Sequence, residues 1–136
     1  MNDRSFSYRP VQPGDLKAFC GFASSEEELF YFFPKAHFPL TPAQLQASID
    51  KRVDSIVMEH IGLLAGFANF YHWEEGGSCS IGNVVINPRL RGLGAGRYLM
   101  RVMIELAELK YQAREVKESC FNHNTSALLL YRSLGF

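Results

Sequence analysis

The sequence predicts an α/β protein with a mixed β-sheet that carries helices on both faces. The chain has 136 residues, the length of one domain. A chain of this size can bury about two-thirds of its unfolded surface without metals or disulfides. Its residues are 47% hydrophobic and 21% charged, which is an ordinary globular mixture. Strand-like and helix-like segments alternate along it, and one helix joins two strand candidates. We therefore expect residues 1–136 to form a single domain.

The first strand and the first helix are predicted from a turn and a cap. A short strand over residues 8–11 ends at the turn residues 12–14. Asp15 can cap a helix, because the apolar residues after it fall at helical spacing. These residues are Leu16, Phe19, Phe22 and Ala23. The stretch 24–33, which is polar and then aromatic, is assigned to no element, and the prolines beyond it predict a loop.

The second helix begins with a nearly complete start signal. Thr41 is the expected N-cap, Pro42 occupies the first helical position, and Gln44 closes a capping box. The helix is expected to run to about residue 52.

The rest of the chain predicts three strands, a helix, a strand and a last helix. Strands are expected over residues 55–59, 63–72 and 79–86, a helix over 98–110, a strand over 115–121 and a helix over 124–135. The predicted order is β-α-α-β-β-β-α-β-α. Tight turns make the earlier strands antiparallel, whereas the crossover helix makes the strands over 79–86 and 115–121 parallel.

Composition and charge argue against several classes of protein. Fourteen basic residues balance fourteen acidic ones, so the chain lacks the basic excess of most nucleic-acid binders. No run approaches the ~20 apolar residues of a membrane-spanning helix, and the N-terminus lacks the apolar core of a signal peptide. Cys20, Cys79 and Cys120 are too scattered for a disulfide framework or a metal site. We expect a cytoplasmic protein without a metal, a membrane contact or a nucleic-acid partner.

A glycine-rich loop between the strand over 79–86 and the crossover helix carries the strongest functional signal. Gly92, Gly94 and Gly96 remove side chains where the backbone must approach a ligand closely. The N–H groups of this loop would point out of a helix N-terminus, which is a ready anion site, and Arg91 and Arg97 add positive charge. Pyrophosphate is the group that we expect here.

Other interpretations of this loop fit less well. A Walker A loop ends in Gly-Lys-Ser/Thr, whereas Gly96 is followed by Arg97 and Tyr98. A dinucleotide-binding fingerprint has glycine at its first, third and sixth positions, and the sixth position counted from Gly92 is Arg97. A glycine turn without a ligand is the minority interpretation, because three glycines and two arginines lie together between a strand and a helix.

Two stretches of the chain match patterns of one family. Arg91, Gly94 and Gly96 meet the pattern Arg/Gln-x-x-Gly-x-Gly/Ala, and residues 124–136 meet the pattern Asn-x-x-Ala-x-x-x-Tyr-x-x-x-Gly-Phe. In both respects the chain closely resembles the GNAT superfamily of N-acetyltransferases. The predicted element order over residues 8–136 agrees with the fold of that family.

The resemblance implies that acetyl-CoA, or another acyl-CoA, is the ligand. The pyrophosphate would lie on the loop, and the pantetheine arm and thioester would hydrogen-bond the end of the preceding strand. The loop residues so implied are Arg91, Gly92, Leu93, Gly94, Ala95, Gly96 and Arg97, and the strand residues are Val84, Val85 and Ile86. Tyr131 is implied as the general acid beside the coenzyme sulfur, and Asn124 as a contact of the coenzyme. The implied activity is direct transfer of an acetyl group to a primary amine, on a small molecule or on a peptide or protein N-terminus.

The general base is left open by the sequence. Some family members carry a glutamate on the strand before the glycine loop, where this chain has residues 79–81. Others carry one on the strand after the crossover helix, where this chain has Ser119 with Glu118 beside it. A shift by one residue would turn Glu118 to the other face of the sheet. His72, Glu74 and Glu118 are the candidates, and transfer without an enzymic base is the alternative.

One departure from the family pattern is large. GNAT domains usually continue after the Gly-Phe pair with two more strands, whereas this chain ends at Phe136. We expect either a truncated chain or a partner subunit, as in a homodimer, that pairs with the exposed edge of the sheet. A non-catalytic acyl-CoA-binding domain is the alternative function, and a phosphate-binding module for another nucleotide is a third. The sequence does not identify the amine acceptor.

Overall fold

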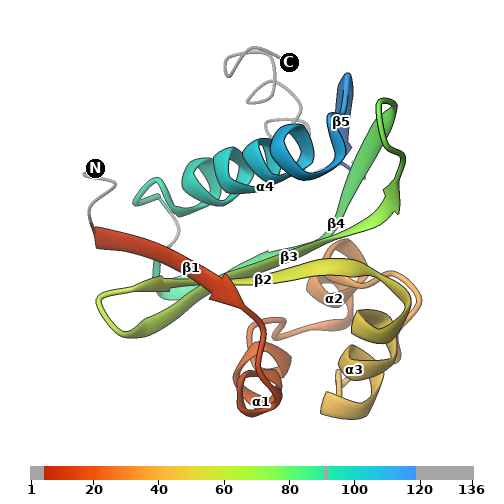
Figure 1. Ribbon diagram of the computed structural model, residues 1–136. Coiled ribbons are helices and arrows are strands. Elements are labelled where there is room, and N and C mark those ends of the chain that lie inside the picture. The colour runs from red at the N-terminus through yellow and green to blue at the C-terminus, as the bar shows by residue number, and fades with distance from the viewer. Residues whose placement is uncertain (1–4, 91, 119–136) are drawn as a thin grey trace.

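The computed structural model of the chain describes residues 5–90 and 92–118. These residues form a five-stranded sheet in the order β1-β2-β3-β4-β5, with helices on both faces (Figure 1). The strands are β1 (Phe6–Pro10), β2 (Val53–His60), β3 (Leu63–Trp73), β4 (Ser78–Ile86) and β5 (Glu115–Glu118). The helices are α1 (Leu16–Cys20), α2 (Glu26–Phe32), α3 (Pro42–Lys51) and α4 (Ala95–Tyr111), with the short 3₁₀ helices η2 (Pro13–Asp15) and η3 (Pro88–Leu90).

The pairing of the strands confirms the mixed sheet that the sequence predicts. β1, β2, β3 and β4 are antiparallel neighbours, and β4 pairs in parallel with β5. The helix α4 connects the two parallel strands and lies along one face of the sheet, whereas α1, α2 and α3 lie on the other face (Figure 1). The sheet is therefore the middle layer of three.

Each face of the sheet buries its own hydrophobic cluster. Ile81 of β4 packs in the cluster that contains Leu99 and Met103 of α4. Val85 of the same strand packs in the opposite cluster, with Phe19 of α1 and Phe32 of α2. Side chains alternate between faces along a regular strand, so two residues four positions apart should share a face. The change of face between Ile81 and Val85 therefore indicates an irregularity in β4.

The helix α2 was not predicted from the sequence. Over the described residues the predicted order is therefore corrected to β-α-α-α-β-β-β-α-β. The Oγ of Ser25 accepts a hydrogen bond from the Glu28 N–H at 3.2 Å and caps this helix. The acidic residues in its first turn are stabilised by the positive end of the helix. Leu29 and Phe32 are 2% and 3% exposed and pack in the same cluster as Phe67 of β3. The polar and aromatic stretch therefore forms one amphipathic helix. Its residue pattern alone does not distinguish this helix from a loop.

Several predicted boundaries shift as well, and the largest shifts are in two helices. The helix α4 begins at Ala95, three residues earlier than predicted, because the chain turns into the helix directly after Gly94. The helix α1 ends at Cys20, before the last apolar positions that were predicted for it. The predicted helix over 124–135, and the end of the predicted strand over 115–121, lie outside the described residues.

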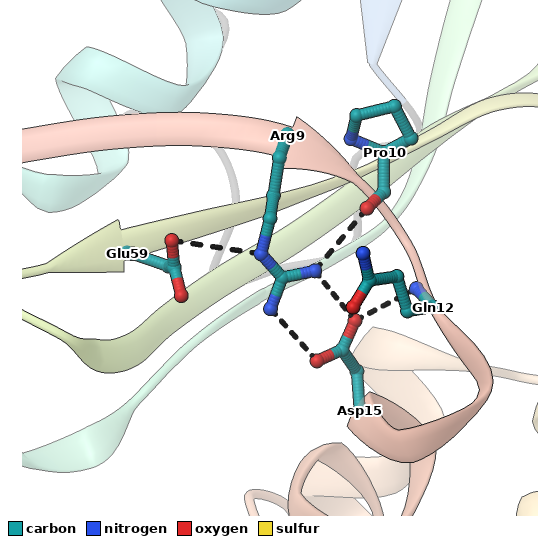
Figure 2. Close-up of polar contacts among 5 residues, drawn as sticks. All are labelled: Arg9, Pro10, Gln12, Asp15 and Glu59. Carbon is teal, nitrogen blue, oxygen red and sulfur yellow. Dashed lines mark hydrogen bonds and ion pairs between the residues drawn. The ribbon is translucent and has the colours of Figure 1, made fainter.

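An ion pair ties β1 to the start of α1, as Figure 2 shows. The guanidinium of Arg9 donates to both carboxylate oxygens of Asp15, each at 2.9 Å, and its Nε lies 3.5 Å from Glu59 Oε1 on β2. The backbone N–H of Gln12 also donates to Asp15, at 2.8 Å. Asp15 is only 7% exposed. The hydrogen bonds from Arg9 hold the pKa of the Asp15 carboxyl below its usual value, and those same bonds raise the pKa of Arg9.

We predict that Asp15→Asn lowers the free energy of unfolding by about 1–3 kcal/mol at neutral pH, because hydrogen bonds to charged groups are lost. The lowered pKa of Asp15 means that the stabilisation is present above the pKa of the unfolded state and disappears as the pH falls through the folded pKa. Urea unfolding of the variant and the wild type over a series of acidic pH values should therefore show the difference shrinking.

The exposed Asp50, which accepts a hydrogen bond only from Gln46 among the described residues, provides the matched control. Asp50→Asn should change the free energy of unfolding by less than about 0.5 kcal/mol. Equal effects of the two substitutions, or an Asp15 effect that persists unchanged in acid, would contradict the role of the ion pair.

Candidate functional site

The irregularity in β4 is one extra residue at Asn83. Phe67 of β3 lies opposite Val85, and Asn69 lies opposite Gly82, so two residues of β4 face one of β3. Asn83 has a left-handed backbone with φ of 53°. Asparagine visits this conformation more readily than most residues, and a bulge of this kind bends its strand and redirects the side chains beyond it.

A buried network of hydrogen bonds holds this bulge. Asn83 Nδ2 donates to the carbonyl of Phe32 at 3.0 Å, and Asn83 Oδ1 accepts from Ser48 Oγ at 2.8 Å and from Asn69 Nδ2 at 3.2 Å. Asn69 also donates to Ser55 Oγ at 3.3 Å. The four side chains of the network are buried. Since a buried amide is costly unless its groups are bonded, the network fixes the bulge to α2, α3, β2 and β3.

Beyond the bulge, residues 84–86 lead toward the glycine loop. Val85 and Ile86 pair with β3, as a regular strand would. The ladder between β4 and β5 ends, within the described residues, at the pair of Ile81 and Glu118, before the bulge. Successive residues of a strand turn their backbone groups to alternate edges. Residues 84–86 therefore also present backbone groups on the β5 side.

Asn87 fastens the beginning of the loop to β3. Its backbone N–H donates to the carbonyl of Ala65 at 2.8 Å, and its Nδ2 donates to the carbonyl of Leu64 at 2.9 Å. Its Oδ1 accepts from the Arg89 N–H at 3.0 Å and so shapes η3. The direction in which the chain leaves β4 is therefore fixed.

The loop then enters α4 through two glycines with left-handed backbones. Gly92 has a φ of 84°, and Gly94, the N-cap of α4, has a φ of 83° and provides no side-chain cap. The first hydrogen bond of the helix runs from the Tyr98 N–H to the carbonyl of Gly94 at 3.0 Å. The N–H groups of residues 95–97 precede it, and a Cβ at Gly96 would meet no described atom within 4 Å. This helix N-terminus can accept an anion.

Only some of the predicted site residues belong to the described part of the chain. Ala95 is 1% exposed and packs the first turn of α4 against the sheet, whereas Arg97 is exposed beside it. Arg91, Asn124 and Tyr131 lie outside the described residues, so their roles stay predictions.

Among the candidates for the general base, Glu118 is buried. It is 8% exposed, and burial raises the pKa of its carboxyl to about 7. It lies opposite Ile81 in the parallel ladder, and Val116, two residues earlier on β5, packs in the cluster of α4. Glu118 therefore lies on the α4 side of the sheet, one pair away from the bulged part of β4.

His72 and Glu74 form an exposed pair at the far end of β3. His72 Nε2 lies 3.2 Å from Glu74 Oε1, and their side chains are 48% and 57% exposed. The hydrogen bond from His72, followed by those from Ser78, lowers the pKa of the Glu74 carboxyl. The pair lies beside the start of β4, and β4 must run several residues further to reach the bulge.

Arg52 and Tyr71 are neighbours of the bulge that the sequence analysis missed. The Arg52 guanidinium donates to Asn69 Oδ1 at 3.1 Å and lies 5.4 Å from the centre of the Tyr71 ring. A Cβ at Gly82 would come within 2.6 Å of Arg52 Nη1 and 2.7 Å of the Tyr71 ring. Neither residue belongs to a motif, and only the register of the sheet brings them together.

The described residues contain neither a metal-binding cluster nor a membrane-spanning helix. No group of three or more histidine, cysteine, aspartate or glutamate side chains could hold a metal ion there. No helix in that part of the chain is both long and apolar enough to cross a membrane.

The sequence matches one family model, that of the acetyltransferase (GNAT) family, over residues 20–136. No curated protein matches the chain.

Solved structures resemble the chain closely in fold. The putative acetyltransferase yncA from Salmonella typhimurium, solved with acetyl-CoA, aligns with a TM-score of 0.71 at 19% identity, over 97% of this chain and 79% of that one. The spermidine N-acetyltransferase from Vibrio cholerae, in complex with CoA and spermine, aligns with a TM-score of 0.74 at 18% identity, over 97% and 80% of the two chains. A GNAT-family acetyltransferase from Bacillus anthracis aligns with a TM-score of 0.73 at 18% identity, over 96% and 79%.

We predict that Asn83→Ala destabilises the fold more than Ser48→Ala does. The first change leaves three partners without Asn83 and places alanine in a left-handed backbone. Unsatisfied buried partners cost about 1–3 kcal/mol and the backbone roughly 1–2 kcal/mol. Ser48→Ala removes one bond and should cost about 1 kcal/mol. Urea unfolding measures both values, and equal losses would show that the bulge does not depend on Asn83.

Proposed function

Because the chain belongs to the GNAT family of acetyltransferases, we propose that it transfers an acetyl group from acetyl-CoA directly to a primary amine. The observation that carries this proposal is the sequence of bulged strand, glycine loop and open helix N-terminus from Asn83 to α4. Two of the structures that share this fold were solved with acetyl-CoA or CoA.

The described residues fit the two halves of the coenzyme. The diphosphate would accept hydrogen bonds from the N–H groups of residues 95–97, where Gly96 leaves room and Arg97 adds charge. The open space at Gly96 is compatible with a bound phosphate, and its place in the first turn of α4 is what relates it to the diphosphate. The pantetheine arm would pair with the backbone groups of residues 84–86 on the β5 side, as an added strand would.

Three residues outside the described part of the chain complete the proposal. Arg91 would add a second positive charge beside the diphosphate, and Asn124 would contact the coenzyme. Tyr131 would protonate the departing thiolate as a general acid. These roles follow the family motifs that the three residues match.

Glu118 is the general base that we favour over His72 and Glu74. Transfer requires a group that takes a proton from the acceptor ammonium near neutral pH, and an effective base has its pKa near the working pH. Burial raises the pKa of Glu118 to about 7, whereas hydrogen bonding lowers the pKa of Glu74. Glu118 lies opposite Ile81, beside the bulge, and the acetyl end of the coenzyme would lie at this bulge.

The acceptor class is a primary amine on a small molecule or on a peptide or protein N-terminus. Release of the CoA thiol, measured against a panel of such amines, tests the activity itself. Thiol release that depends on the amine is the result expected, and acetyl-CoA binding without release to any amine would overturn the catalytic proposal.

We predict that substitutions at Gly96 separate folding from coenzyme binding. Gly96→Val should weaken CoA binding by more than roughly 100-fold, because its side chain would occupy the space proposed for the diphosphate. Gly96→Ala, which the family pattern allows, should bind CoA and stabilise α4 by up to about 1 kcal/mol. Calorimetric titration with CoA and thermal unfolding measure these two effects.

Gly14→Val provides the matched control, because a Cβ at Gly14 also meets nothing within 4 Å and the residue lies in η2, on another part of the chain. Its CoA affinity should equal that of the wild type. Unchanged CoA affinity in a folded Gly96→Val variant would refute the placement of the diphosphate.

We predict that the wild-type kcat/KM rises with pH through a limb near pH 7 and that Glu118→Gln removes this limb. Amines of different basicity separate the enzyme's limb from ionisation of the substrate. His72→Gln and Glu74→Gln should keep the limb. A limb that follows the pKa of each amine, in the wild type and in Glu118→Gln alike, would mean that no enzymic base acts.

Stability provides an independent check of the same carboxyl. Because the pKa of Glu118 is raised on folding, the wild type should lose stability as the pH rises from the unfolded pKa through the folded one, by about 3–4 kcal/mol in all. Glu118→Gln should not show this loss, and equal slopes in urea unfolding would contradict the raised pKa.

A further inference from the structure

Arg52 carries a positive charge onto the sheet face that α1, α2 and α3 cover. The residue follows the last turn of α3 as its C-cap, directly before β2. Its Nη1 donates to Asn69 Oδ1 at 3.1 Å, and its guanidinium lies over the ring of Tyr71. The same nitrogen lies against the backbone of Gly82, where a Cβ would come within 2.6 Å of it. A side chain at residue 82 would displace the guanidinium.

This arginine has no carboxylate partner among residues 5–90 and 92–118. Within that part of the chain its side chain donates one hydrogen bond, to a neutral amide, and burial lowers the pKa of the guanidinium. Arg9 of the same protein, by contrast, has carboxylate partners, since both oxygens of Asp15 and an oxygen of Glu59 lie around it. A half-buried guanidinium stays charged, and its fork of N–H groups matches an oxoanion such as a carboxylate.

Arg52 lies beside the part of β4 at which the proposed acetyl transfer would take place. Gly82 immediately precedes Asn83, and residues 84–86 would hold the pantetheine arm and thioester. Arg52 is also bonded to Asn69, which belongs to the network that holds the bulge. An acceptor whose charged group reached Arg52 would therefore lie beside the bulge, on the α1–α3 side of the sheet. Its proton would reach Glu118, on the α4 side, through the opening beyond the last described pair of β4 and β5.

We propose that Arg52 binds the carboxylate of the acceptor, and that the acceptor is a small primary amine that carries a carboxylate, as amino acids do. The inference rests on the proposed function and narrows its substrate class. A polyamine such as the spermine bound to the Vibrio cholerae enzyme has no anionic group for this arginine, and its positive charges would be repelled by it.

Matched pairs of amino acids and their amides test the proposal, because each pair differs only in the carboxylate. Wild-type kcat/KM, measured by CoA thiol release, should be roughly 10–100-fold higher for the acid than for the amide. The amine of an amino acid amide is less basic than the amine of the acid, so a larger fraction of it is unprotonated at neutral pH. This difference favours the amide as an acceptor and cannot produce the expected preference for the acid. Arg52→Gln keeps a donor for Asn69 and should bring the ratio of acid to amide close to one.

Arg114→Gln is the control, since Arg114 is exposed in the connection between α4 and β5 and its loss changes the net charge equally. The ratio should stay at its wild-type value there. A wild type that prefers amides or polyamines, or an Arg52→Gln variant with an unchanged ratio, overturns the role of Arg52.

Calorimetry distinguishes this failure from failure of the proposed function. A chain that does not bind acetyl-CoA refutes the coenzyme site itself, whatever the acceptor. Titration of amino acids and amides into the CoA-bound protein measures the same preference without turnover. Equal affinities of the wild type for acid and amide in that titration would also overturn the inference.

Discussion

One extra residue in β4, Asn83, changes which strands and which core the two ends of β4 contact. Before Asn83, β4 pairs with β3 on one edge and with β5 on the other, and Ile81 packs under α4. After it, Val85 packs on the opposite face. The left-handed backbone at this point is stable because Asn83 is bonded to Phe32, Ser48 and Asn69. The packing of α2 and α3 and the path of the chain toward α4 therefore depend on the same buried amide.

Some charged side chains form ion pairs that hold the fold together, whereas others are positioned to bind a ligand. Arg9 is surrounded by Asp15 and Glu59, and this pairing ties β1 to α1 and β2 (Figure 2). Arg97 and the N–H groups at the start of α4 face outward at the end of the glycine loop, where they suit a phosphate. Arg52 lies on the α1–α3 side of β4 without a described carboxylate. The proposed coenzyme and acceptor therefore each have a cation for which residues 5–90 and 92–118 provide no ion-pair partner.

Much of the fold could be predicted from the sequence, because caps, turns and hydrophobic periodicity are local. The capped start of α3 at Thr41 and the parallel pairing across α4 are examples. The helix α2 escaped prediction because its aromatic residues have no clear period until Leu29 and Phe32 are seen to share a core. The glycine loop was found from its motif, whereas Asn83 and Arg52 were not, since their roles come from strand register and from residues distant in sequence.

The proposed function requires the coenzyme to lie along residues 84–86 and to end on the first turn of α4. Backbone amide chemical shifts of the isotope-labelled chain, followed during titration with CoA, report on this placement residue by residue. The largest changes are expected at residues 84–86 and 92–97. Small changes are expected at residues 74–77 and 111–114, which lie together at the opposite end of α4, where the Gly76 N–H donates to the Tyr111 carbonyl. Changes concentrated at residues 74–77 and 111–114, or none at the start of α4 at saturating CoA, would contradict this placement.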